Sequence, residues 1–123
     1  MSGQGRREIG AIGEKIALAH LSAKGLRLIA RNYRCKGGEL DLVMLDGTTL
    51  ALVEVRMRSE SHFGSAAESV TPAKQRRLIV AAKHLLLTRR ELARRRARFD
   101  VVALEPDVRG EMRVEWIKDA FRV

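Results

Sequence analysis

The sequence predicts one mixed α/β domain, in which a central sheet is flanked by helices in the order αβββαββ. Three observations support this prediction. The chain has 123 residues, the size of a single domain. It is 46% hydrophobic with only 10 Gly and 2 Pro, a composition that can bury a core and excludes a disordered chain. Its apolar residues follow a helical spacing in two stretches and form short β-rich runs elsewhere, without internal repeats, heptads or a long linker.

The first predicted helix runs from Arg6 to Lys24. Its apolar residues recur at three- and four-residue spacing, and Gly25 is a suitable C-terminal stop. Three short β-rich runs follow, separated by glycine-containing breaks, at residues 26–34, 38–46 and 49–57. Runs of this kind, with such short breaks, predict a three-stranded meander.

A second helix is predicted to begin after Thr71, because the threonine side chain can cap a helix and Pro72 suits its first position. The helix is predicted to end near the arginine run at 94–96. Two further runs of strand character, FDVVAL and RVEWIK, complete the sheet.

The formal charge of the chain is +9 and its pI is about 10.8. The whole excess lies in residues 71–98, which carry ten basic side chains and one acidic side chain. Two interpretations remain open at this point. The stretch is a surface that follows the phosphates of a nucleic acid, or it is the solvated face of a helix.

The chain contains one cysteine, Cys35, which excludes an internal disulfide and a zinc ribbon. A single unpaired thiol predicts a reducing compartment, the cytoplasm. The N-terminal residues lack the apolar core of a signal peptide, and Lys83 and His84 interrupt the most apolar stretch. We therefore expect neither a signal peptide nor a membrane span.

Four charged residues interrupt the otherwise apolar strands 38–46 and 49–57: Glu39, Asp41, Glu54 and Arg56. A two-residue loop at Gly47-Thr48 would pair residues whose numbers add to 95, which places Asp41 opposite Glu54. A four-residue loop keeps this register, whereas a three-residue loop with a bulge breaks it.

Opposed carboxylates repel each other, so a facing pair of Asp41 and Glu54 requires a cation or exposure to solvent, and a divalent metal would meet the requirement. Arg56 lies on the same strand face as Glu54, where it could neutralise a carboxylate or hold a phosphate. Glu14 shares a side of the first helix with small and apolar residues and is a candidate to point inward. The alternative is an ordinary cluster of ion pairs at a sheet edge.

Six segments that cover nearly the whole chain resemble the YraN-like family of small bacterial proteins: GAIGEKIALAHLSAKGLRLIARNYR, GGELDLVMLDG, LALVEVRMRS, AAESVTPAKQRRL, RFDVVAL and VEWIKDAF. That family is similar to the restriction-endonuclease-like nucleases, which include archaeal Holliday-junction resolvases. Their αβββαβ core carries an Asp and a Glu-x-Lys motif. The resemblance implies a restriction-endonuclease-like fold.

It further implies that Asp41 and Glu54 bind Mg²⁺ or Mn²⁺ and that Glu14 matches the helix-one acid of the resolvase-like members. Arg56 then occupies the motif lysine position. Leu40 stands where the motif expects proline, a minor departure. The arginine matters more, because a guanidinium stays protonated and cannot take a proton from water.

These residues predict a metal-dependent endonuclease in which Asp41, Glu54 and Arg56 are catalytic and Asp41, Glu54 and Glu14 are metal ligands. The expected substrate is DNA, including branched DNA, and symmetric cutting would require a homodimer. A non-catalytic nucleic-acid-binding protein and an RNA-associated module are the alternatives. The residues expected to contact nucleic acid are Lys74, Gln75, Arg76, Arg77, Lys83, Arg89, Arg90, Arg94, Arg95 and Arg96.

Overall fold

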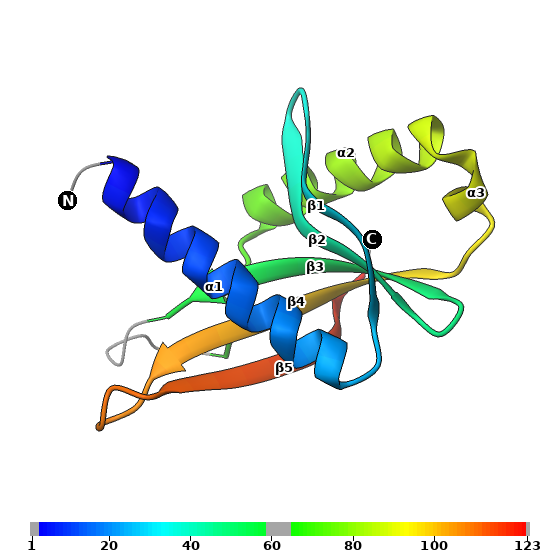
Figure 1. The fold of residues 1–123 in the computed structure, drawn as a ribbon. Helices are drawn as coiled ribbons and strands as arrows, with labels where there is room; N and C mark the ends of the chain where they lie inside the picture. The colour runs from blue at the N-terminus through cyan, green and yellow to red at the C-terminus, as the bar shows by residue number, and fades with distance from the viewer. Residues whose placement is uncertain (1–2, 59–64, 123) are drawn as a thin grey trace.

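The computed structural model describes residues 3–58 and 65–122 (Figure 1). Its elements, in chain order, are α1 (Gly3–Ala23), β1 (Arg27–Cys35), β2 (Gly38–Asp46), β3 (Thr49–Met57), α2 (Pro72–Thr88), α3 (Arg90–Ala93), β4 (Ala97–Pro106) and β5 (Met112–Phe121). Within the described ranges, no helix is both long and apolar enough to cross a membrane.

The five strands form one sheet in the order β1-β2-β3-β4-β5. β3 and β4 are parallel, and the other neighbouring pairs are antiparallel. The parallel pair requires a crossover, and α2 with α3 supplies it. α1 lies across one face of the sheet and α2 across the other (Figure 1). The predicted mixed α/β domain is confirmed, and it is consistent with a restriction-endonuclease-like fold.

A hydrophobic cluster fills each face of the sheet. Leu52 and Val101 of the strands pack with Leu78 and Leu85 of α2 on one face. The other face buries residues of α1 against β2, β3 and β4: Ala17, Leu21, Leu42, Met44, Val53 and Leu104. β2, β3 and β4 are therefore covered on both sides, which explains why their sequences are apolar in both alternating positions.

The predicted boundaries of the first helix and the meander are confirmed to within three residues. The second helix begins at Pro72 as predicted, and the Thr71 side chain accepts a hydrogen bond from the Lys74 backbone N–H at 3.2 Å, as the cap requires. The helix ends at Thr88, well before the arginine run at 94–96. Two further features differ. The last two strands are longer than the runs FDVVAL and RVEWIK. The four-residue helix α3 was not expected, because its N-terminus has no side-chain cap to signal it.

The predicted register between β2 and β3 is confirmed. Asp46 pairs with Thr49 across the two-residue turn, where Gly47 adopts a φ of 62°, and the pairing continues to Leu42 and Val53. Beyond that point, residues 38–40 of β2 pair with β1 only. The tip of the β1–β2 hairpin therefore leaves β3 and runs beside α2 (Figure 1). Asp41 and Glu54 lie at the fork where the two strands separate.

Gly38 allows the hairpin tip to approach α2. A Cβ atom at this position would overlap the backbone carbonyl of Arg77 and would lie 2.9 Å from the backbone nitrogen of Ala81. Only glycine permits two backbones to come this close. The contact fixes the direction in which β2 leaves β3 and thereby the width of the fork.

Candidate active site

Asp41 of β2 and Glu54 of β3 bring their carboxyl groups within hydrogen-bonding reach of each other. Asp41 Oδ2 accepts a hydrogen bond from the Val55 backbone N–H at 2.8 Å. The carboxylate is thus bound to the backbone of β3 at the fork, beyond the last pair of the β2–β3 ladder. Glu54 is 4% exposed, which is unusual for a glutamate. The structure thus brings the two acids together one position beyond the last residue pair of the ladder, with Glu54 buried and Asp41 partly buried.

The backbone changes direction at Asp41. Leu40 belongs to the cluster on the α2 face and Leu42 to the cluster on the α1 face, although alternating residues of a regular strand share one face. The irregularity coincides with Asn32 in β1, whose φ is 51°. Asn32 lies between Arg31 and Tyr33, the partners of Leu42 and Leu40, and asparagine tolerates this left-handed conformation better than most residues.

Asn32 also reaches the site through its side chain, which hydrogen-bonds the carboxylate of Glu14 on α1. Glu14 is partly buried and close enough to Asp41 for the aspartate charge to raise its pKa. The structure therefore turns Glu14 toward the acid pair, as its helix position suggested. Sequence reasoning missed Asn32. The only available signal was an asparagine inside a strand, where this residue is depleted.

Lys74, in the first turn of α2, approaches the pair from the opposite face of the sheet. Its Nζ lies 3.5 Å from Glu54 Oε1. Gln75, the neighbouring candidate, donates from Nε2 to the Val70 carbonyl at 3.1 Å, so its amide nitrogen holds the segment that leads into α2. Of the two candidates, Lys74 is the one whose side chain reaches the acids.

Arg56 lies near the pair, and its charge lowers the pKa of Glu54. It makes no ion pair with any side chain in residues 10–58 or 65–122, and its Nε is buried without a hydrogen-bond partner there. Leaving a buried N–H unsatisfied is costly, so such a group is a site where a ligand oxygen would bind. Arg56 thus retains hydrogen-bonding capacity beside two carboxylates.

Burial raises the pKa of all three carboxyl groups. For Glu54, burial and the charge of Asp41 outweigh the opposing effects of Lys74 and Arg56 and raise the pKa to about 7. For Asp41, burial outweighs the hydrogen bond from Val55 and raises the pKa above its usual value. The pKa of Glu14 is raised by burial first and by Asp41 second. Burial is thus the main cause of all three shifts, and a neighbouring carboxylate adds to it at each site.

The chemistry of the donors fits a hard divalent cation. Asp41 Oδ1 and Glu54 Oε2 take part in neither the Val55 hydrogen bond nor the Lys74 ion pair. Mg²⁺ in proteins is commonly held by one or two carboxylates together with water and substrate phosphates. No group of three or more His, Cys, Asp or Glu side chains in the described part of the chain could hold a metal. Glu14 as a third metal ligand beside the pair therefore stays a prediction.

The structure divides the candidate nucleic-acid contacts into two groups. Lys74 and Gln75 are partly buried, and the exposed Arg76, Arg77 and Lys83 lie farther along α2. The other exposed arginines follow the C-terminal end of α2, roughly 24 Å from its first turn at 1.5 Å per residue: Arg89, Arg90, Arg94, Arg95 and Arg96. Of these residues, Lys74, Gln75, Arg76 and Arg77 lie at the end of α2 that reaches the acids, and Lys83 lies nearer its other end.

Replacing Asn32 by alanine is expected to lower the free energy of unfolding by about 1–2 kcal/mol, because alanine lacks the amide and disfavours a positive φ. Asn32→Gly removes the same amide but accepts the conformation, so it should retain most of the stability. Chemical denaturation of both variants separates the two contributions. Equal losses in the two variants would show that the side chain, and not the backbone, is what matters.

Comparisons with known proteins agree with the resemblance seen in the sequence. A family model described as "Uncharacterised protein family UPF0102" matches residues 13–104. The chain is 58% identical to a UPF0102 protein of Cupriavidus taiwanensis over 94% of its own length and 84% of that protein. It is 50% identical to one of Herminiimonas arsenicoxydans, with 94% and 88% covered. It is 45% identical to one of Nitrosococcus oceani, with 95% and 94% covered.

Proposed function

The chain belongs to the uncharacterised protein family UPF0102, as its resemblance to the YraN-like proteins indicated, and we propose that it is a metal-dependent endonuclease that hydrolyses DNA phosphodiester bonds. One observation carries the proposal. A buried carboxylate, Glu54, and a partly buried one, Asp41, lie together at a fork in the sheet, with the cationic side chains of Lys74 and Arg56 beside them. Acids that hold a metal, next to cations that hold a phosphate, are what phosphodiester cleavage requires.

In this mechanism Asp41 and Glu54 hold Mg²⁺ or Mn²⁺. A bound ion supplies Lewis acidity and makes a neighbouring water more acidic. The Val55 N–H fixes Asp41, so the direction of its carboxylate is set before substrate binds. The unpartnered Nε–H of Arg56 donates to an oxygen of the scissile phosphate and stabilises the charge that develops there. Glu14, held by Asn32, orders water beside Asp41.

Arg56 occupies the motif lysine position, and Lys74 can take over the role that an arginine does not perform. Arg56 can clamp a phosphate, but it cannot accept or release a proton in the neutral pH range. The ammonium of Lys74 comes from α2 rather than from β3 and lies against Glu54. Lysine, unlike arginine, serves as a proton donor or acceptor in enzyme sites. We therefore assign the proton-handling role to Lys74 and the phosphate-binding role to Arg56.

The exposed cations of α2 support a nucleic acid as substrate. Arg76 and Arg77 lie on the first turns of the helix that carries Lys74. Contacts of this type track phosphates without reading base sequence. With aromatic residues at 4% of the chain, stacking on single-stranded bases is not the main expected mode. Structure-selective cutting, including that of branched DNA, fits these features, and a homodimer would allow symmetric cuts.

The alternative is a non-catalytic nucleic-acid-binding protein that retains the nuclease fold. The specific observation in its favour is Arg56, since the chain has lost the motif lysine from β3. In this case the acid pair would contribute only to the stability of the fold. The basic surface would bind the nucleic acid. An RNA-associated role belongs to the same class, because positive charge does not separate RNA from DNA.

A cleavage assay decides between the two functions. Purified protein is incubated with linear, flapped and four-way-junction DNA in Mg²⁺, in Mn²⁺ or in EDTA. The expected products require metal and disappear in Asp41→Asn and Glu54→Gln, while both variants still bind DNA. Binding without cleavage on every substrate and in both metals would reject the nuclease. Loss of DNA binding in the carboxylate variants would contradict the division of roles.

Replacing both Arg76 and Arg77 by glutamine is expected to weaken DNA binding and to reduce the salt dependence of the association constant by about 1.8 in log–log slope, at about 0.9 per phosphate contact. Filter binding or fluorescence anisotropy at several salt concentrations measures the slope. The double variant Lys24→Gln/Arg109→Gln, at exposed positions outside α2, is the control because it removes the same two charges. An unchanged slope in the α2 double variant would show that α2 does not contact the phosphates.

A further inference from the structure

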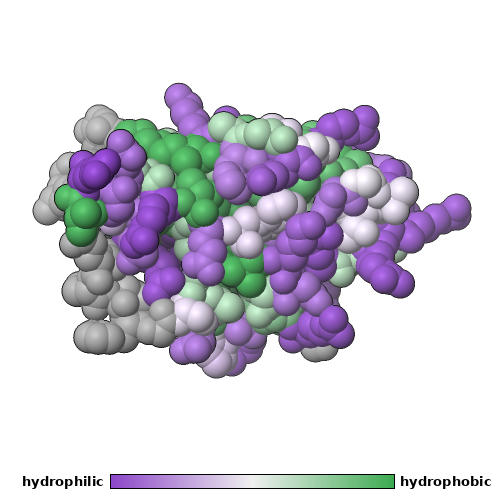
Figure 2. Space-filling model, turned by 90° about the horizontal axis from the view of Figure 1, so that it is seen from below, coloured by the Kyte–Doolittle hydropathy of each residue, from purple (hydrophilic) through white to green (hydrophobic). Residues whose placement is uncertain are grey.

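An open groove, called here the α2–α3 groove, lies where α2 ends and α3 begins, at the end of α2 that is remote from the acid pair. Its volume is about 710 Å³, and the residues that line it are Leu86, Leu87, Arg90, Glu91, Ala93 and Arg94. Leu87 is 73% exposed. Small apolar areas between hydrophilic side chains are ordinary on a protein surface, as the face in Figure 2 shows. The apolar part of this groove differs because it is concave and bordered by arginines that the proposed cleavage mechanism does not use.

The α2–α3 groove carries a net positive charge. The short helix α3 buries Leu92, and Arg90 and Arg94, two positions to either side of it, are exposed on the opposite side. Neither arginine makes an ion pair or a side-chain hydrogen bond with any side chain that the structure describes. Glu91 is the only acid of the lining, and Arg89 Nε donates to its Oε1 at 2.9 Å. With this ion pair included, the groove still has two more positive charges than negative ones.

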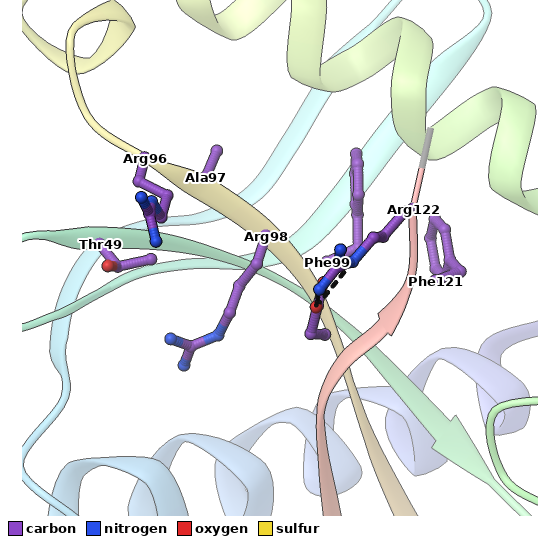
Figure 3. A pocket seen from close by; sticks show the side chains of 8 residues that line it. Thr49, Arg96, Ala97, Arg98, Phe99, Phe121 and Arg122 are labelled. Atoms are coloured by element: carbon purple, nitrogen blue, oxygen red, sulfur yellow. Dashed lines mark hydrogen bonds and ion pairs between the residues drawn. The ribbon is translucent and has the colours of Figure 1, made fainter.

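The next two arginines of the chain lie near the β2–β3 turn instead. Arg95 Nη1 donates to the Thr48 carbonyl at 3.3 Å. Arg96 lines a separate cavity together with Thr49, the first residue of β3 (Figure 3). Neither of them lines the α2–α3 groove, so the charge of the groove comes from the residues of α3 and its two ends.

The lining of the groove favours a protein segment over a nucleic acid. Residues 71–98 contain no Phe, Tyr or Trp on which a nucleotide base could stack. Phosphate contacts to Arg90 and Arg94 would leave Leu87 exposed. A segment that combines acidic side chains with a protruding apolar side chain would use both the charged and the apolar part of the groove.

The turn between β4 and β5 is a segment of this kind. Val108 is 94% exposed, the highest value among the large apolar residues that the structure describes. Asp107 fixes the turn, because its Oδ1 accepts hydrogen bonds from the backbone N–H groups of Arg109 and Glu111 at 2.8 and 2.9 Å. The tip is therefore ordered before a partner binds, which lowers the entropic cost of binding.

The turn also belongs to a part of the chain with a net negative charge. Residues 99–123 carry six acidic and four basic side chains, although the whole chain has a charge of +9. Residues 107–111 of the turn carry two acids and one base. At the base of the turn, Glu105 and Arg113 form an ion pair at 3.7 Å and compensate each other. The charge of the turn is therefore opposite in sign to that of the groove.

One molecule cannot place its own turn in its own groove. α3 lies shortly before β4 and the turn directly after it, at opposite ends of a ten-residue strand (Figure 1). A strand of this length is roughly 33 Å long at 3.3 Å per residue. The two complementary surfaces can therefore meet only between two molecules.

We propose that the α2–α3 groove binds the β4–β5 turn of a second copy of this chain, with Val108 against Leu87 and the acids of the turn near Arg90 and Arg94. Burial of the two apolar side chains favours the association, and the opposite charges select the surfaces that meet. In a pair related by a twofold axis, each copy supplies one groove and one turn, so two equal contacts form. Such a pair requires neither metal nor nucleic acid and does not depend on the proposed cleavage.

Sedimentation velocity of the full chain in EDTA tests the proposal over protein concentrations of about 1 μM to about 1 mM, which cover micromolar to millimolar dissociation constants. The salt concentration is about 0.15 M, where screening over about 8 Å lets local charges outweigh the net charge of the chain. The variants are Leu87→Glu in the groove and Val108→Lys in the turn, and each introduces a charge that repels the partner surface. Ile12→Lys, at a 58% exposed position of α1 outside both surfaces, is the control. Circular dichroism verifies that each variant is folded.

We expect the wild type to pass from monomer to dimer within this range. Leu87→Glu and Val108→Lys should each raise the dissociation constant at least about tenfold, whereas Ile12→Lys should leave it unchanged. An equimolar mixture of Leu87→Glu and Val108→Lys should dimerise again, because the first supplies an intact turn and the second an intact groove.

The proposal is overturned if the wild type stays monomeric up to about 1 mM, if only one of the two variants weakens the association, or if Ile12→Lys weakens it as much. A mixture of the two variants that stays monomeric would also overturn it, since the groove and the turn would then not be partners. A monomeric wild type that binds an oligothymidylate, with the affinity lowered by Leu87→Glu, would assign the groove to nucleic acid instead.

Discussion

The variant Asp100→Ala is expected to lose about 3–5 kcal/mol in free energy of unfolding, the cost of breaking a buried charge pair by removing one partner. Asp100 has no exposed surface, although it lies in an apolar strand. It accepts hydrogen bonds from Arg98 Nε at 2.9 Å, from Trp116 Nε1 at 3.0 Å and from the Asp119 N–H at 3.0 Å. Alanine would leave all three donors without this acceptor, and of the two carboxylates that hold the guanidinium only Asp46 would remain.

Urea denaturation measures this loss, and Trp116, the only tryptophan of the chain, reports the transition by its fluorescence. Glu115→Ala removes a carboxylate from an exposed position of β5 and should change the stability by no more than about 0.5 kcal/mol. A loss of less than about 1 kcal/mol in the free energy of unfolding of Asp100→Ala, roughly the contribution of one ordinary hydrogen bond, would contradict this prediction. The carboxylate would then not connect β4 to β5 as the contacts indicate.

Local signals were enough to predict most of the fold. The capped start at Thr71, the glycine turn at Gly47 and the alternation of apolar residues determine the elements and the β2–β3 register. The role of Asp100 could not be predicted from such local signals. Its acceptors are satisfied by donors from positions 98, 116 and 119, which meet only after β5 pairs with β4. The strand pattern around it contains no sign of those partners.

The same limit applies to the candidate site. Because register follows from the turn, the sequence sufficed to bring Asp41 and Glu54 together. The position of Lys74 depends on where the crossover places α2 on the sheet. The sequence alone therefore indicated only that Lys74 lies near the same end of the sheet as the acids. The positive φ of Asn32 is a backbone conformation and leaves no periodic signal. The fork in the sheet follows from it and from the contact of Gly38 with α2.

Glu54→Gln is expected to be more stable than the wild type at pH 8, by on the order of 1–3 kcal/mol, and nearly equal to it at pH 4.5. Burial and the charge of Asp41 raise the pKa of Glu54 from 4.5 to about 7. The folded protein therefore binds this proton more tightly than the unfolded chain does. The stabilising effect of the proton is complete below about pH 4.5 and is lost as the pH rises towards 7. Glutamine is uncharged throughout and avoids that loss.

Thermal denaturation of both proteins between pH 4.5 and 8 measures the difference, and added Mg²⁺ supplies a second comparison. A cation that binds only the folded wild type should recover part of its lost stability at pH 8 and should affect Glu54→Gln much less. An acid kept for structure would do the opposite, since removing it would destabilise the protein at neutral pH. A variant that gains stability while it loses metal binding would identify Glu54 as a residue retained for function at a cost in stability.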